Sequence, residues 1–169
     1  MMSDIWLISD THFNHRNILT FNDDEGNPIR PGFANVNEMD EYMIDRWNSV
    51  VKDGDIVYHL GDVYFGELGQ LLNRCHGRKR LILGNHDNGK DQNLLRSFGK
   101  IQMWRMFPEF GLLLTHVPVH ESSLVRKDFT MRNVHGHLHQ RKIADERYVN
   151  VSVEQINYTP VHIEELRIV

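Results

Sequence analysis

The chain has 169 residues, 40% of them hydrophobic and 25% charged, with a formal net charge of −4 at pH 7. These values are ordinary for a folded globular protein, and the length predicts a single domain over residues 1–169. The negative charge disfavours an extended nucleic-acid-binding surface, which would need a basic face.

A single cysteine, Cys75, excludes an intramolecular disulfide and is typical of a reducing compartment. The N-terminal apolar stretch is too short for a signal peptide. Nowhere does the sequence hold the roughly 20 consecutive apolar residues that cross a bilayer. We therefore expect a cytoplasmic protein without membrane association.

Taken in chain order, the first predicted strand covers residues 5–9, a short apolar run that ends at Asp10. Residues 21–33 are polar and contain several glycines and prolines, which predicts a loop.

Residues 37 to about 51 predict a helix. Met39, Met43 and Trp47 recur at a spacing that forms one apolar face. Asn35, with a glutamate three residues later, resembles a capping pair at the start of this helix.

Two further strands and two short helices follow. Residues 55–60 predict a strand that ends just before a Gly-Asp dipeptide, and residues 80–83 predict a strand that ends before a Gly-Asn-His-Asp string. Residues 67–74 and 91–98 are helix candidates, each followed by a glycine.

In the last third of the chain the pattern changes to strands. Residues 100–107 and 110–114 predict a hairpin, and the second of these strands ends at a Thr-His dipeptide. Residues 131–134 and 148–153 predict two more strands. The segment from Val161 is ambiguous between strand and helix.

Four of the predicted strands share one feature, because each delivers polar residues at its carboxyl end. Near-continuous apolar runs suit strands that are covered on both faces. Alternation of strand and helix predicts a layered α/β domain. Ligands of open α/β sheets bind beyond the carboxyl ends of strands, so we expect these polar residues to surround one crevice.

Five short strings supply these polar residues. They are Asp10-Thr11-His12, Gly61-Asp62, Gly84-Asn85-His86-Asp87, Thr115-His116 and Gly136-His137-Leu138-His139. Together they offer carboxylates, imidazoles and one amide oxygen, a mixture that can hold two neighbouring divalent cations.

Each string alone has a plainer interpretation. Asp-x-His and Gly-Asp are common in turns, Gly-Asn-His-Asp can be an ordinary turn, and Gly-His-Leu-His can be a polar hairpin. All five at predicted strand ends would require several coincidences. Crowding so many carboxylates and imidazoles without a metal would also leave polar groups unpaired, which is costly.

The five strings, in this order, resemble the complete motif set of the calcineurin-like metallophosphoesterases, and the match extends from residue 10 to residue 139. The chain is similar to small microbial and phage-type members with one domain. The resemblance implies a four-layer α/β/β/α sandwich. It also implies that a hydroxide bridging two metal ions attacks the phosphorus of a phosphoester.

The resemblance further implies a division of ligands. One ion would be held by Asp10, His12, Asp62 and His139, and the other by Asp62, Asn85, His116 and His137, with Asp62 bridging. His86 would protonate the leaving group, and Asp87 would orient His86. Imidazole, carboxylate and amide ligands suit Mn, Fe, Zn, Co or Ni. Among these metals the resemblance implies Mn²⁺, which we expect.

We therefore predict a metal-dependent phosphoesterase, a phosphodiesterase acting on a nucleotide or another small phosphodiester. A phosphomonoesterase on the same site and a nuclease remain open, as does a metal-binding interaction module without turnover.

Overall fold

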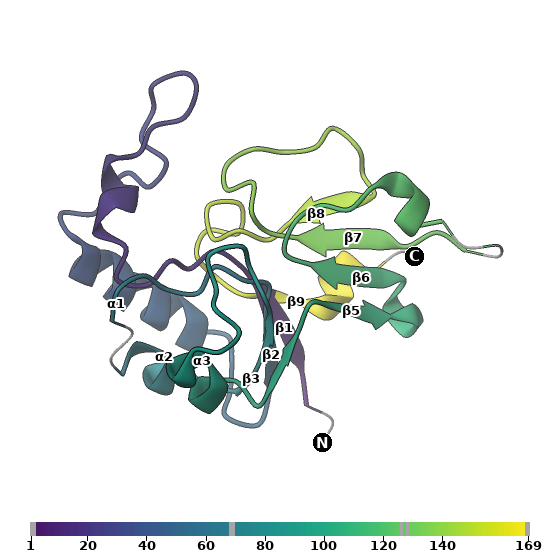
Figure 1. Ribbon diagram of the computed structural model, residues 1–169, viewed down its shortest axis with the longest axis horizontal. Coiled ribbons are helices and arrows are strands. Elements are labelled where there is room, and N and C mark those ends of the chain that lie inside the picture. The colour runs from purple at the N-terminus through teal and green to yellow at the C-terminus, as the bar shows by residue number, and fades with distance from the viewer. Residues whose placement is uncertain (1–2, 68–69, 126, 128, 168–169) are drawn as a thin grey trace.

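The computed structural model describes residues 3–67, 70–125, 127 and 129–167, which form two β-sheets with helices beside them (Figure 1). The first sheet has the strand order β4-β3-β2-β1-β9 and the second has the order β5-β6-β7-β8. The strands of the first sheet are β1 Ile5–Ile8, β2 Ile56–His59, β3 Arg78–Ile82, β4 Lys100–Gln102 and β9 Val161–His162. Those of the second are β5 Trp104–Phe107, β6 Leu112–Thr115, β7 Arg132–His135 and β8 Tyr148–Asn150.

Parallel pairing dominates both sheets. Strands β1 to β4 are parallel to one another, as are β6, β7 and β8. Only the edge strands β9 and β5 pair in the antiparallel sense. The carboxyl ends of neighbouring parallel strands therefore meet at one edge of each sheet.

The helices are short apart from the first. The α-helices are α1 Val36–Asn48, α2 Leu71–Arg74 and α3 Gln92–Ser97, and the 3-10 helices are η1 Arg16–Thr20, η2 Pro108–Phe110, η3 Glu121–Ser123 and η4 Ile163–Leu166. Asn35 caps α1 by accepting a hydrogen bond from the backbone N–H of Glu38 at 3.0 Å, which confirms the predicted cap. The helix predicted over residues 67–74 extends over residues 68 and 69, which lie outside the described part, and α2 begins only at Leu71.

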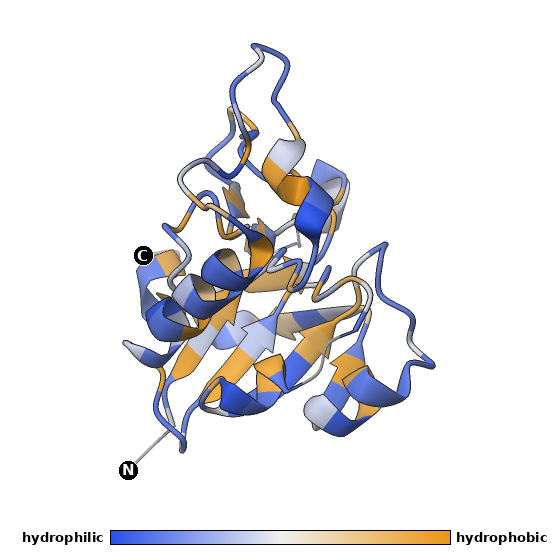
Figure 2. Ribbon diagram, turned by 90° about the vertical axis from the view of Figure 1, so that its left-hand side faces the viewer, coloured by the Kyte–Doolittle hydropathy of each residue, from blue (hydrophilic) through white to orange (hydrophobic). Residues whose placement is uncertain are grey.

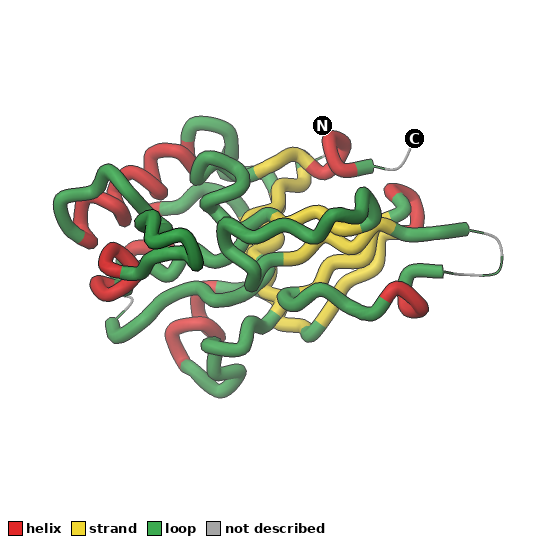
Figure 3. Tube along the Cα trace, turned by 90° about the horizontal axis from the view of Figure 1, so that it is seen from above, coloured by secondary structure: helices red, strands yellow, loops and turns green. Residues whose placement is uncertain are grey.

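Two apolar cores account for the layering. The three α-helices bury their apolar side chains against the first sheet, where Val57 and Leu81 face them. Leu7 and Leu114 lie in a second core between the two sheets. The α-helices gather on one side of the strands (Figures 1 and 3), and the apolar residues concentrate in the strands while the projecting loop 21–33 is mostly hydrophilic (Figure 2). A mixed α/β fold is thereby confirmed.

The outer face of the second sheet has a different cover. Leu113 alternates with its inward-facing neighbours and packs against Leu124 and Met131. Leu124 directly follows η3, so in the described part of the chain a 3-10 turn and its loop stand where a helical layer was expected.

None of the helices in the described part of the chain has the length and apolar character of a membrane-spanning segment.

The segment predicted as one strand over residues 100–107 is divided between the sheets. Its first part, β4, pairs with β3, and its second part, β5, pairs with β6 in the other sheet. Met103 lies at the change of direction and is 67% exposed. Because an apolar run is compatible with either sheet, sequence periodicity could not reveal which edge each half would join. The ambiguous C-terminal segment forms the short strand β9 followed by η4.

Candidate metal centre

Every proposed ligand follows the carboxyl end of a parallel strand. Asp10 and His12 follow β1, Asp62 follows β2, Asn85 follows β3, His116 follows β6, and His137 and His139 follow β7. The sequence-predicted crevice is thus formed by loops from both sheets. The structure brings the seven side chains into two adjoining groups.

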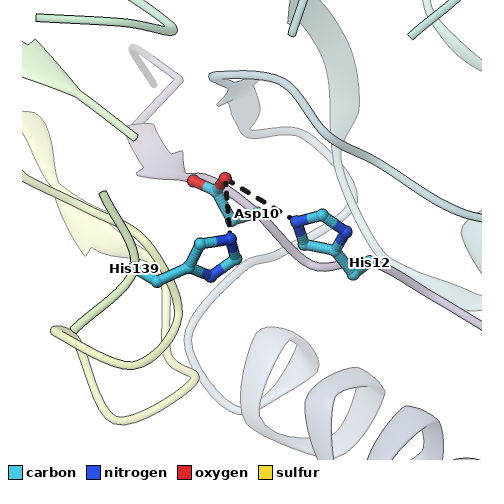
Figure 4. Close-up of side chains that lie close together, drawn as sticks. All are labelled: Asp10, His12 and His139. Atoms are coloured by element: carbon cyan, nitrogen blue, oxygen red, sulfur yellow. Dashed lines mark ion pairs between the residues drawn. The ribbon is translucent and has the colours of Figure 1, made fainter. Parts of the chain in front are cut away.

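The first group contains Asp10, His12 and His139, whose side chains converge as Figure 4 shows. Asp10 Oδ1 lies 3.8 Å from His12 Nε2 and 3.9 Å from His139 Nε2. Asp10 Oδ1 and both ring nitrogens of His12 are buried without a hydrogen-bond partner among the described residues. Buried polar atoms are nearly always satisfied, so Asp10 Oδ1, His12 Nε2 and His139 Nε2 fit a cation that these three atoms would share.

The second group contains Asp62, His116 and His137, joined by Asn85. His116 Nε2 lies 3.4 Å from Asp62 Oδ2 and 2.8 Å from Asn85 Oδ1. His137 Nδ1 lies 2.9 Å from the same Asn85 oxygen. Two imidazoles, a carboxylate and an amide oxygen form a donor set for a first-row divalent metal.

Asp62 links the two groups. Its Oδ2 atom, which faces His116, also lies 3.8 Å from His12 Nε2 in the first group. Its Oδ1 atom accepts a hydrogen bond from the backbone N–H of His86 at 3.0 Å, which holds the carboxylate in this orientation. A single carboxylate therefore stands between both groups.

Backbone strain is concentrated at these residues. Asp10, His12, Asp62, His137 and His139 all have left-handed φ values, between 48° and 68°. Such values are uncommon for residues other than glycine and cost of order 1 kcal/mol or more each unless the surroundings impose them. The structure thus holds five proposed ligands in conformations that an unconstrained loop would avoid.

Two of the motif glycines are required because neighbouring atoms approach them closely. A Cβ atom on Gly84 would lie 2.1 Å from Asp62 Oδ1, and one on Gly136 would lie 2.3 Å from Asp10 Oδ2. Any larger residue would displace a proposed ligand.

Hydrogen bonds from behind set the orientation of the ligands. Asp10 Oδ2 accepts from the backbone N–H of His137 and from the Ser152 hydroxyl, both at 2.9 Å. His116 Nδ1 donates to the carbonyl of Leu60 at 2.7 Å, which leaves Nε2 free to face the crevice. Partners of this kind fix the tautomer of metal-binding histidines.

His139 has a charged partner that sequence analysis missed. Its Nδ1 atom lies 2.9 Å from Glu154 Oε1, and the same oxygen accepts a hydrogen bond from Arg30 Nε at 2.8 Å. Arg30 is 1% exposed and also donates to the backbone carbonyls of Asp10 and Thr11. Arg30 lies in the predicted polar loop and Glu154 just beyond a predicted strand, so neither carried a local signal.

The ionisable groups perturb one another strongly. Burial would raise the pKa values of Asp10 and Asp62, but neighbouring histidines hold both below the ordinary range. Burial lowers the pKa of His12, whereas Asp62 raises that of His116 and Glu154 raises that of His139 despite their burial. The site thus keeps two carboxylates ionised, which favours cation binding.

His86 lies at the rim of the site. Its exposed ring has its centroid 6.0 Å from that of His12 and 5.1 Å from that of Phe65. Phe65 also stacks on His15 with 4.0 Å between centroids and on His12 with 5.3 Å between centroids, so it contacts three histidines. Sequence analysis did not single out Phe65, because one aromatic residue in a loop carries no pattern.

Asp87 is hydrogen-bonded to backbone groups around it. Its carboxylate accepts hydrogen bonds from the backbone N–H groups of Asp62, Val63 and Gly84 at 2.8–3.0 Å. Among the described residues, Asp87 accepts no hydrogen bond from His86. Its oxygens tie the loop after β3 to the backbone of the loop after β2, and the orientation of His86 by Asp87 stays a prediction.

His59 supports the site from below. It is fully buried, and burial lowers its pKa to about 3, so the ring is neutral. Its Nδ1 accepts from Gly61 N–H at 3.2 Å, and its Nε2 therefore donates to the Thr11 hydroxyl at 2.9 Å. These bonds connect the loops that carry Asp10 and Asp62.

No model of a known protein family matches the chain. It is 35% identical to the uncharacterized protein MJ1445 of Methanocaldococcus jannaschii, over 96% of this chain and 89% of that protein. It is 30% identical to the gene 66 proteins of Mycobacterium phages L5 and D29, in each case over 90% of this chain and over 87% and 89% of theirs.

Among solved structures, the protein of unknown function AQ665 from Aquifex aeolicus superposes with a TM-score of 0.76 at 26% identity, covering 98% of both chains. A conserved uncharacterized protein from Streptococcus pneumoniae, described as a predicted phosphoesterase, gives a TM-score of 0.41 at 13% identity, covering 92% of this chain and 75% of the other.

Proposed function

We propose that this protein is a dinuclear-metal-dependent phosphoesterase. The chain belongs to the family of the archaeal protein MJ1445 and the mycobacteriophage gene 66 proteins. One observation carries the proposal. Two adjoining groups of nitrogen and oxygen ligands share a single carboxylate oxygen, Asp62 Oδ2. A pair of divalent ions roughly 3.5–4 Å apart is the arrangement that hydrolytic enzymes use on phosphoesters.

The donor atoms fit two cations. Asp10, His12, Asp62 and His139 would hold one ion, and Asp62, Asn85, His116 and His137 would hold the other. The unpaired buried atoms of Asp10 and His12 support the first assignment. Mn²⁺ is the proposed metal, because the set contains no thiolate and suits a first-row divalent ion with mixed N and O ligands.

When bound, such ions withdraw charge from a phosphoryl group and lower the pKa of water toward about 7. The chain itself supplies orientation and a proton. Asp62 and Asp10, held ionised, would hold the cations. His86 is the proposed donor of a proton from a ring nitrogen to the oxygen that leaves phosphorus, because its exposed ring stands at the rim of the site.

A phosphodiester is the proposed substrate, since the described residues include no large inserted cap that would close the site around a small monoester. The same ligands would serve a phosphomonoesterase, so the two are separated by experiment. The order of the five strings supports membership of the calcineurin-like metallophosphoesterases. Their four-layer sandwich would require η3 and its loop to stand for the outer helical layer.

The deciding experiment measures bound metal and turnover together. Purified chain reconstituted with Mn²⁺ should hold two ions and hydrolyse bis(4-nitrophenyl) phosphate faster than 4-nitrophenyl phosphate, and chelation should abolish both reactions. Asp62→Ala should lose metal pairing and turnover at the same time. Two bound ions with no hydrolysis of either ester, together with tight binding of a partner, would instead favour a non-catalytic module.

His86→Ala tests the proton donor. Turnover should fall by roughly 10²–10⁴-fold on diesters with poor leaving groups, which need protonation, and much less on 4-nitrophenyl esters. Equal losses on both classes would contradict the assignment of His86.

A further inference from the structure

An apolar cavity adjoins the second group of ligands. Its volume is about 740 Å³, within the roughly 300–1,000 Å³ of small-molecule sites. Asn85 and His116, whose Oδ1 and Nε2 atoms are 2.8 Å apart, are among its lining residues. The rest of the wall is mainly apolar, with Met103, Trp104 and Val117 among its residues.

The cavity arises where the chain passes from one sheet to the other. Met103 lies between β4 and β5, and Trp104 is the first residue of β5. In the antiparallel pairing of β5 with β6, Trp104 is opposite Thr115, which directly precedes His116. Strand pairing therefore places Trp104 beside the residue that directly precedes His116, a proposed metal ligand.

Two hydroxyl groups of the wall already have hydrogen-bond partners. The Thr115 hydroxyl donates to the carbonyl of Val117 at 2.6 Å and accepts from Asn133 Nδ2 at 2.9 Å. The Ser122 hydroxyl lies 2.9 Å from His120 Nδ1. Among the described residues that line the cavity, none is an aspartate, glutamate, lysine or arginine. The wall therefore offers apolar surface more than specific hydrogen bonds.

The apolar side chains at the mouth are unusually open to solvent. Trp104 is 54% exposed and Val117 is 45% exposed. Large apolar groups gathered beside a reactive site gain free energy when a ligand covers them. Because the cavity opens onto Asn85 and His116, a ligand that covers it would have its polar end at the metal site.

We propose that this cavity binds a planar aromatic substituent of the phosphoester, a nucleobase or another aryl group, against Trp104. The inference rests on the proposed function and names its substrate class. The acidic chain and the uncharged wall oppose a long polyanionic strand. In a molecule with one aromatic group joined to one or two phosphates, the aromatic group would fill the cavity and the phosphate would lie at the two ligand groups.

The test compares two ligands that share a head group. Binding of phenylphosphonate and methylphosphonate to the Mn²⁺-loaded full chain is measured by titration calorimetry. Phenylphosphonate should bind on the order of 10-fold or more tightly than methylphosphonate, as expected when an aryl group fills an apolar pocket. Trp104→Ala should bring this ratio close to one, and Trp104→Phe should retain most of it. Phe129→Ala, which removes an exposed aromatic residue outside the cavity wall, should leave the ratio unchanged.

The failures are distinguishable. Equal affinities in a chain that hydrolyses aryl phosphates with metal would overturn the aromatic pocket and leave the phosphoesterase standing. Absence of metal-dependent hydrolysis and of phosphonate binding would overturn both proposals. If Trp104→Ala keeps the ratio but converts a dimer to a monomer in sedimentation, the apolar mouth is a surface for a second copy of the chain, and the pocket proposal is wrong.

Discussion

Replacing Glu154 by glutamine tests a residue that supports the site without changing any of the proposed metal ligands. In the structure Glu154 Oε1 contacts both His139 Nδ1 and Arg30 Nε, at 2.9 and 2.8 Å. Both charged side chains are nearly inaccessible, with 0% of Arg30 and 4% of Glu154 exposed. The substitution removes a negative charge while keeping the size of the side chain.

Two consequences follow from this geometry. Leaving a buried ion without its partner costs about 3–5 kcal/mol, and we expect the lower value, about 3 kcal/mol, because the glutamine oxygen can still accept a hydrogen bond. For a chain of this size that corresponds to a melting temperature lower by roughly 6–12 °C. His139 also loses the carboxylate that orients it, which should weaken metal binding about 10–100-fold.

The stability of Glu154→Gln is measured by thermal unfolding in chelator, so the result does not depend on any ion. Metal affinity is measured separately by titration with Mn²⁺. Glu41→Gln is the matched control, because Glu41 pairs with Arg74 on the exposed surface. It should shift the melting temperature by no more than about 2 °C. An unchanged melting temperature and unchanged Mn²⁺ affinity in Glu154→Gln would refute the reasoning.

Two further predictions concern burial and close packing. Burial raises the pKa of Asp40 from 3.8 to about 6, although both oxygens accept from the backbone N–H of Asn14 at 3.1–3.2 Å. Protonated Asp40 therefore contributes to the free energy of unfolding, and this contribution is complete below pH 3.8 and is lost as the pH rises through 6. Asp40→Asn should therefore stabilise the chain by about 1–2 kcal/mol above pH 7, allowing for partial screening, with no gain at pH 4 in urea unfolding. Gly136→Ala should abolish Mn²⁺ binding, because the added Cβ would push Asp10 aside. The control Gly54→Ala should bind Mn²⁺ normally, because its Cβ would meet nothing within 4 Å. Normal Mn²⁺ binding by both variants would contradict the prediction and show that the loop around Gly136 can move to make room for the Cβ.

Several features could be predicted because their signals are local. The apolar runs of β1, β2, β3 and β6 and the polar residues after them are readable from neighbouring letters. Parallel strands then bring their carboxyl ends to one edge, so the convergence of the seven side chains follows from the element order. That these residues bind metal and that the chain folds as one domain stay predictions.

Other features depended on contacts between distant segments. Arg30 and Glu154 are 124 residues apart and neither belongs to a motif. Asp87 stands next to His86 in the sequence, yet its oxygens turn toward the backbone of another loop. In both cases the partner of a polar side chain is set by which loops pack together, which no periodicity records.

The sequence by itself determined the polar residues that are proposed as ligands, their order and the strands that deliver them, because alternation and strand-end chemistry act over a few residues. Tertiary structure alone decided that residues 100–107 divide between two sheets, so that Met103 and Trp104 open an apolar cavity beside Asn85. It also decided that Glu154 lies behind His139 and the carbonyl of Leu60 behind His116. The physical reason is that an extended apolar segment satisfies its backbone equally well at either sheet edge, and only packing of the whole chain selects between them.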